Sequence, residues 1–123
     1  MNATIEHIRE KNLFSKKLVL PESKNISGKI KELVIQNDPD ALVVLFGSRA
    51  RGDAGDESDW DILVLTNKDA DSLSQRLLKD CLNRLELPLG IAISLIVKER
   101  TEWFDRYSVT PLFDTIQNEG ILL

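Results

Sequence analysis

The sequence predicts a small α+β domain, in which a mixed or antiparallel sheet carries helices on one face. Short apolar runs have the length of buried strands, and the segments between them repeat apolar residues at helical spacing. The two kinds of segment alternate along a chain of 123 residues, which has room for a single core. We divide the chain into an N-terminal extension, 1–25, packed on the domain, and the domain itself, 26–123.

The first half of the domain is expected to contain one helix and two strands. Apolar residues at helical spacing predict a helix over 27–37, and an unbroken apolar run predicts a buried strand over 41–46. A turn and an acidic loop follow. The segment 59–66 then predicts a second strand, which we expect to pair with the first as an antiparallel neighbour.

The second half is expected to contain three helices and one or two strands. A helix is predicted over 71–86, with Asp71 as its N-cap and a buried stripe of Leu73, Leu77, Leu78, Cys81, Leu82 and Leu85. A strand over 91–97 and a short helix over 99–107 follow. Thr110, Pro111 and Gly120 are typical of the start and end of a final helix. The apolar residues 121–123 either add a strand to the sheet edge or face a partner.

Composition narrows the class of protein. The net charge of −4 gives no support for direct nucleic-acid binding, which usually requires a basic face. Cys81 is the only cysteine and His7 the only histidine, which argues against a disulfide, Cys-His or Ser-His catalysis and a histidine-based zinc site. The sequence shows no signal-peptide pattern and no long apolar span, so we expect a cytoplasmic protein without membrane contact.

The segment that follows the first strand has features of a phosphate-binding turn. It reads Gly47-Ser48-Arg49-Ala50-Arg51-Gly52. Small residues at the end of a strand let backbone N–H groups approach an anion closely, and a helical turn starting at Ser48 would favour phosphate there. The alternative is an ordinary tight turn between strands, with Arg49 and Arg51 solvated or paired to acidic residues of the loop.

Two aspartates at the start of the second strand predict a metal site. Side chains alternate along an extended segment, so Asp59 and Asp61 are expected on the same face. Two like charges at the end of a buried strand repel one another unless a cation lies between them. Carboxylates beside a phosphate turn are typical ligands of Mg²⁺ on a nucleotide. The alternative is a solvated strand start, with Asp59 as a cap.

Gly47-Ser48-x-Ala50-Arg51-Gly52 followed by Ser58-Asp59-x-Asp61 resembles the signature of the minimal nucleotidyltransferases of the DNA polymerase beta superfamily. The similarity is dense over 41–65 and weaker towards the C-terminus. It implies the polymerase-beta-like fold and transfer of a nucleoside monophosphate from ATP, or another nucleoside triphosphate, to a hydroxyl. It also implies that Asp59 and Asp61 are catalytic through Mg²⁺ and that Gly47, Ser48, Arg49 and Arg51 bind the nucleotide.

The resemblance also implies a partner. Stand-alone minimal nucleotidyltransferases resemble one another in acting beside a HEPN-type protein, as the antitoxin of a toxin–antitoxin pair, and some transfer AMP to a tyrosine of the toxin. A protein hydroxyl is therefore the expected acceptor. A homo-oligomer is also compatible with the sequence.

One feature departs from the family. A third carboxylate is usual on the following strand, where it helps to bind metal and can accept a proton. Here that strand, 91–97, contains no acid, and Ser94 is the polar residue expected to face the site. Glu86 and Glu99 flank the strand. Three outcomes fit: catalysis with two carboxylates and a base from substrate or water, slow catalysis, or nucleotide binding without turnover.

Overall fold

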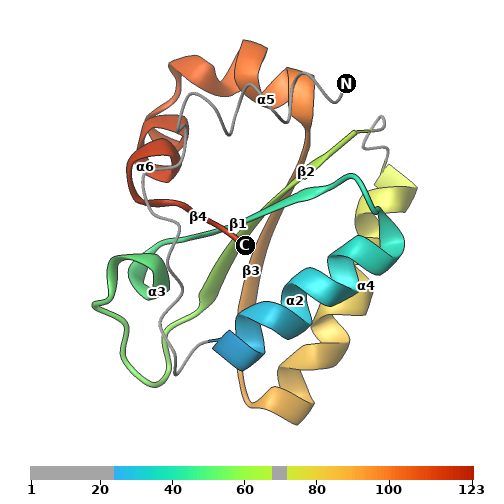
Figure 1. Cartoon of the computed structure of the whole chain (residues 1–123), viewed down its shortest axis with the longest axis vertical. Helices are drawn as coiled ribbons and strands as arrows, with labels where there is room; N and C mark the ends of the chain where they lie inside the picture. The colour runs from blue at the N-terminus through green and yellow to red at the C-terminus, as the bar shows by residue number, and fades with distance from the viewer. Residues whose placement is uncertain (1–23, 68–71) are drawn as a thin grey trace.

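The computed structural model describes residues 24–67 and 72–123, so most of the predicted N-terminal extension and the predicted cap Asp71 lie outside the described residues. Its centre is a four-stranded sheet in the order β3-β2-β1-β4 (Figure 1). The strands are β1 Leu42–Phe46, β2 Trp60–Thr66, β3 Ile93–Glu99 and β4 Ile121–Leu122. β1 is antiparallel to both of its neighbours, and β2 is parallel to β3. The mixed α+β sheet, the antiparallel pairing of β1 with β2 and the C-terminal edge strand are thus confirmed.

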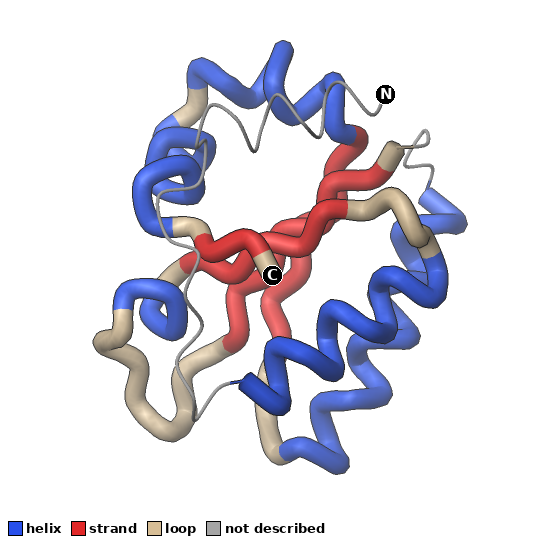
Figure 2. The backbone as a smooth tube through the Cα atoms, viewed as in Figure 1, coloured by secondary structure: helices blue, strands red, loops and turns tan. Residues whose placement is uncertain are grey.

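Helices cover both faces of the sheet, which corrects the prediction of helices on one face. On one face lie α2 (Lys24–Asn37) and α4 (Ser72–Leu89), as Figure 2 shows. On the other lie α5 (Arg100–Arg106) and α6 (Pro111–Glu119), joined by the 3-10 helix η2 (Tyr107–Val109). The short helix α3 (Ser48–Arg51) lies between β1 and β2.

The two central strands explain why one helical layer is not enough. Every residue of β1 is buried, and so is β2 apart from Asp61. Alternate residues therefore need cover on opposite sides: Val43 and Leu45 pack with α2 and α4, whereas Leu42 and Val44 pack with the aromatic side chains of α5 and α6. An unbroken apolar strand is typical of a sheet covered on both faces.

The buried stripe of α4 is narrower than predicted. Leu78 and Leu82 are buried, but Leu73 and Leu77 are 63% and 54% exposed. Because residues four apart share a helix face, a stripe that contains 78 and 82 turns 73 and 77 away from the sheet. The helix also continues to Leu89, beyond the predicted end at 86, with Pro88 in its last turn.

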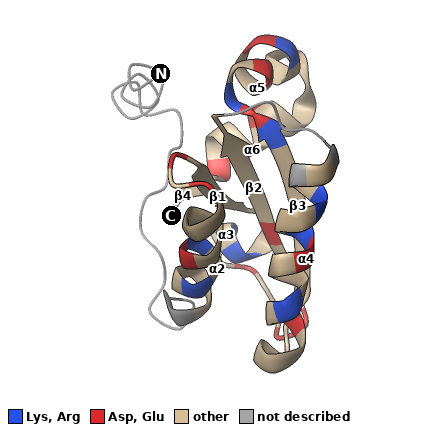
Figure 3. Cartoon of the chain, turned by 90° about the vertical axis from the view of Figure 1, so that its right-hand side faces the viewer, with Lys and Arg blue, Asp and Glu red and all other residues tan. Residues whose placement is uncertain are grey.

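The helix ends on the opposite face agree better with the sequence. Thr110 caps α6 as predicted, with its Oγ1 accepting a hydrogen bond from the Phe113 N–H, and Pro111 occupies the first turn. Within the described ranges no helix is both long and apolar enough to cross a membrane. Basic and acidic residues are interspersed along the helices and strands (Figure 3), in line with the weakly acidic net charge.

Candidate active site

The two halves of the predicted motif meet at one end of the sheet. β1 ends at Phe46 and β2 begins at Trp60, and the antiparallel register places Phe46 opposite Asp61. On the other side of β2 the parallel register places Ser94 beside Asp61. The turn that starts at Gly47, the aspartate of β2 and the serine of β3 are therefore neighbours, although they lie far apart in the sequence.

Gly47 is required by the position of Asp61. Its φ of 74° lies in the region that side chains rarely adopt, and a Cβ built on it would lie 2.1 Å from Asp61 Oδ2. The carboxylate of Asp61 thus packs against the Gly47 backbone, with no room for a side chain between them. This contact is a structural reason for the glycine, beside the predicted one of phosphate approach.

The electrostatics of Asp61 match a site that attracts cations. Burial raises the pKa of the Asp61 carboxyl and the charge of Asp59 raises it further, whereas the charge of Arg51 lowers it. Asp59 itself is exposed, one residue before β2. A carboxylate that is partly desolvated and faces a like charge is destabilised in its ionised form, and a bound cation would relieve both effects.

No third acid completes the pair among the described residues. Ser94, which is exposed, pairs with Asp61 in the parallel register, at the position where the sequence resemblance implies a carboxylate. Glu86 accepts a hydrogen bond from the Ile93 N–H (2.9 Å), and Glu99 caps α5 by accepting from the Thr101 and Glu102 N–H groups. Within 24–67 and 72–123, no three acidic, histidine or cysteine side chains converge as metal ligands.

Two carboxylates nevertheless fit a nucleotide-bound Mg²⁺. That ion is usually held by one or two protein carboxylates, with water and substrate phosphates completing its shell. Asp59 and Asp61 supply hard, anionic oxygens, and burial and the charge of Asp59 raise the pKa of Asp61 although the charge of Arg51 lowers it. The donor set is therefore suitable for the metal that the resemblance implies.

Arg49 holds the acidic loop in place. Its guanidinium donates to the Ser58 carbonyl (3.1 Å from Nη2) and to the Asp56 carbonyl (3.3 Å), and it lies 4.8 Å from the centre of the Trp60 ring. The Ser58 hydroxyl in turn accepts from the Gly55 N–H (2.9 Å). Arg49 thus anchors the loop just before Asp59, and its predicted role in nucleotide binding stays a prediction.

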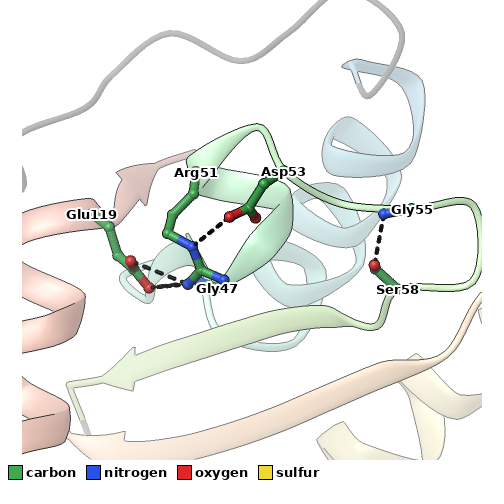
Figure 4. A network of polar contacts seen from close by, with 6 residues as sticks. All are labelled: Gly47, Arg51, Asp53, Gly55, Ser58 and Glu119. Carbon is green, nitrogen blue, oxygen red and sulfur yellow. Dashed lines mark hydrogen bonds and ion pairs between the residues drawn. The ribbon is translucent and has the colours of Figure 1, made fainter.

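Arg51 is paired with two acids. Its Nε donates to Asp53 (3.2 Å), and its Nη1 donates to both carboxylate oxygens of Glu119 (3.1 and 3.2 Å), as Figure 4 shows. The hydrogen bonds that Arg51 donates to Asp53 and Glu119 raise its pKa, so Arg51 stays charged. Oε1 of Glu119 also accepts the Gly47 N–H (3.1 Å). The amide that the sequence predicts to face an anion thus binds a carboxylate of the protein itself.

Sequence reasoning missed Glu119, and the sheet register explains its position. β4 pairs with β1 through Leu45 opposite Ile121 and Val44 opposite Leu122. Continued two residues beyond this pairing, the antiparallel register brings Glu119 opposite Gly47. The apolar C-terminus predicted an edge strand, but the register of two residues cannot be derived from their sequence. The position of an acid two residues before such a strand was the available signal.

The family of the chain is established by comparison with known proteins. The family model for the nucleotidyltransferase domain matches residues 27–121, so the chain belongs to the nucleotidyltransferase domain family. Nucleotidyl transfer is accordingly its class of reaction.

Two curated relatives come from Methanocaldococcus jannaschii. The chain is 33% identical over 79 residues to "Putative protein adenylyltransferase MJ0141", a match that covers 64% of this chain and 74% of the relative. It is 36% identical over 81 residues to "Putative protein adenylyltransferase MJ0604", a match that covers 66% of this chain and 75% of the relative. The names refer to transfer of an adenylyl group to protein.

A solved structure has the same fold. The chain superimposes with a TM-score of 0.55 on a structure titled as a mutant of the toxin–antitoxin MntA-HpeT, at 23% identity, over 77% of this chain and 69% of that one. At this identity the likeness concerns the fold, and it confirms the predicted nucleotidyltransferase architecture.

Proposed function

We propose that this protein transfers AMP from Mg²⁺-bound ATP to a hydroxyl group of a partner protein. The observation that carries the proposal is the juxtaposition of the Asp59–Asp61 pair with the Gly47 turn at one end of the sheet. Membership of the nucleotidyltransferase family and relatives named for protein adenylylation support the reaction and the class of acceptor.

Asp59 and Asp61 would hold the Mg²⁺. When bound there, the ion would neutralise the triphosphate and polarise its phosphorus–oxygen bonds. The chain contributes position and charge. Arg49 fixes the loop that precedes Asp59, and the Gly47 backbone fixes the carboxylate of Asp61 by direct contact. Pre-arranged carboxylates of this kind need no rearrangement when the substrate binds.

The turn after β1 would hold the phosphates. Backbone N–H groups and the hydroxyl of Ser48 are suitable donors to phosphate oxygens, and Ser48 is only partly exposed. Arg51 carries a permanent positive charge beside the turn and would stabilise the negative charge that develops on the leaving pyrophosphate.

In the proposed reaction, a hydroxyl oxygen of the acceptor forms a bond with the α-phosphorus of ATP. The bond from that phosphorus to the β-phosphate oxygen breaks, and pyrophosphate leaves. The proton of the hydroxyl passes to water or to the substrate phosphates, because Ser94 cannot accept it at neutral pH.

The proposed partner is a HEPN-type toxin, with a tyrosine as the acceptor and this chain as the antitoxin. The sequence resemblance to minimal nucleotidyltransferases suggests this partner, and the names of the relatives suggest a protein acceptor. ATP is proposed as the donor because those names specify the adenylyl group.

A transfer assay tests the proposal. The protein is incubated with Mg²⁺, with ATP labelled in the α-phosphate and with the product of the adjacent gene. We expect label on the partner and one pyrophosphate released per AMP transferred, with both lost in an Asp59→Asn/Asp61→Asn variant. If the wild type labels no partner and releases no pyrophosphate, the enzymatic proposal is wrong.

The second candidate function is an antitoxin that binds nucleotide without turnover. The exposed serine in the row of Asp61 favours it, because Glu86 and Glu99 are both engaged in backbone hydrogen bonds and cannot replace the missing acid. The same double variant separates the two functions. If it neutralises the partner as well as the wild type does, binding alone explains the activity.

A further inference from the structure

Glu119 occupies donors that the proposed function assigns to phosphate. Its carboxylate accepts from the Gly47 N–H and, through both oxygens, from Arg51 Nη1. These are a backbone amide and a guanidinium held on one anionic group, the same pair of donors that binds a phosphate oxygen. Figure 4 shows the Glu119 carboxylate facing the Arg51 guanidinium, with Gly47 beside it.

The sheet register places Glu119 beside Gly47, but the end of its helix does not favour a negative charge there. Glu119 is the last residue of α6, where the carbonyl end of the helix disfavours a negative charge. Its side chain is nevertheless only 15% exposed, so it is held by Arg51 and Gly47 rather than by water. The contact joins residues that are 72 and 68 positions apart in the sequence.

Glu119 is held by two polar partners, the Gly47 amide and Arg51, and Arg51 has Asp53 as a second acidic partner. Exchange of one anion for another at the same donors costs little, because a released carboxylate regains its hydration.

We propose that Glu119 is an internal competitor for the triphosphate: in the free protein it holds the Gly47 amide and Arg51, and nucleotide binding replaces its carboxylate with phosphate oxygens. The inference rests on the proposed function, because it assigns the phosphates to this turn. The inference makes Glu119, the last residue of α6, a residue that sets the affinity for the nucleotide.

Inorganic tripolyphosphate without divalent metal is the direct probe, since it tests the turn apart from Asp59, Asp61 and the nucleoside. Calorimetry compares the wild type with Glu119→Gln and Glu119→Ala. We expect both variants to bind more tightly, by about threefold to tenfold, the size of one net hydrogen bond, with alanine at least equal to glutamine. The opposite order, with the wild type tightest, would make Glu119 a support of the turn and would overturn the proposal.

Two matched controls separate competition from a general change in charge. Asp114→Asn removes one negative charge from an exposed residue of the same helix and should leave the affinity within about twofold of the wild type. Asp53→Asn removes the other partner of Arg51 but leaves the Gly47 amide engaged, so it should tighten binding less than Glu119→Gln. Equal tightening by Asp114→Asn would contradict the proposal.

A spectroscopic measurement locates the exchange. In nuclear magnetic resonance spectra, the Gly47 amide, which donates to Glu119 in the free protein, should shift when tripolyphosphate is added to the wild type. Saturation without a shift of the Gly47 amide would place the phosphates elsewhere and overturn the inference.

Failure of this inference and failure of the proposed function have different signatures. If the partner is labelled but the Glu119 variants bind tripolyphosphate no more tightly, the transfer function stands and the competition is wrong. If the variants bind more tightly but no AMP is transferred, the competition stands and the enzymatic proposal is wrong.

Discussion

The acidic residues of the candidate active site, where β1 ends and β2 begins, are in two opposite electrostatic situations. Asp61 is partly desolvated and faces the charge of Asp59, and both effects raise its pKa. Glu119 is neutralised by Arg51 and by a backbone amide. The comparison assigns different ligands to the two places: two carboxylates that repel one another attract a cation, whereas donors already holding a carboxylate are suited to another anion.

The largest expected effect comes from removing one charge of the Asp59–Asp61 pair. Asp61→Asn should lower the rate of AMP transfer by about a thousandfold or more, since the loss of a metal ligand removes several kcal/mol of transition-state stabilisation. Steady-state kinetics at saturating Mg²⁺ measures it. Asp56→Asn, in the acidic loop before β2, is the matched control and should retain the wild-type rate, because Asp56 meets Arg49 through its main-chain carbonyl. Retention of activity by Asp61→Asn would contradict the metal-site assignment.

Restoring the missing acid should act in the opposite direction. Ser94 is exposed and lies in the row of Asp61, so Ser94→Asp places a third carboxylate there with little effect on folding. We expect the transfer rate to rise by about tenfold to a hundredfold, below the full range of general-base catalysis because the rest of the site is not adapted to the added group.

Ser94→Asn is the control for this gain, because asparagine has nearly the size of aspartate but no charge. It should leave the rate close to that of the wild type. An equal gain in both variants would mean that size, and not a carboxylate, limits the reaction.

A substitution at Gly47 should disrupt the packing of Asp61 against the Gly47 backbone. Gly47 and Gly52 both have positive φ, 74° and 87°, but only a Cβ at 47 would collide with Asp61. Gly52→Ala should cost about 1 kcal/mol in free energy of unfolding through backbone strain alone. Gly47→Ala should cost about 1–3 kcal/mol more, because the carboxylate of Asp61 must also move. Chemical denaturation measures both; equal losses would contradict the close packing of Asp61.

The smallest expected effect is a pH dependence of stability. The pKa of Asp61 is raised above its ordinary value of 3.8, so its contribution favours the folded state below that value and is lost as the pH rises through the raised pKa. In metal-free buffer at neutral pH, Asp61→Asn should therefore melt at a higher temperature than the wild type. The difference should shrink as the pH is lowered towards about 4. A lower melting temperature of the variant at neutral pH would contradict the raised pKa of Asp61.

The same two regions show what the sequence could and could not predict. The turn from Gly47 and the pair Asp59 and Asp61 are local patterns, and β1 and β2 are short apolar runs joined by one loop, so their antiparallel pairing followed from the sequence. The position of Glu119 depends on how the two-residue strand β4 pairs with the distant β1, and that register cannot be derived from the two residues themselves.

The burial of apolar residues was likewise predictable only in part. The unbroken apolar character of β1 is visible in the sequence, but the position of the second helical layer that covers it is not. At Leu73 and Leu77 the apolar pattern of α4 was wider than the face that packs on the sheet, so two exposed leucines were assigned to the core. Which of several apolar residues a helix buries depends on its rotation against the sheet, and that is set by tertiary packing.

The most direct test of the central claim, that the Asp59–Asp61 pair binds a metal–nucleotide beside the Gly47 turn, is calorimetry of ATP with and without Mg²⁺. The wild type should release or absorb measurable heat of binding with Mg²⁺, and an Asp59→Asn/Asp61→Asn variant with an unchanged circular-dichroism spectrum should bind at least about a hundredfold more weakly. Binding of equal strength by the folded double variant would contradict the claim.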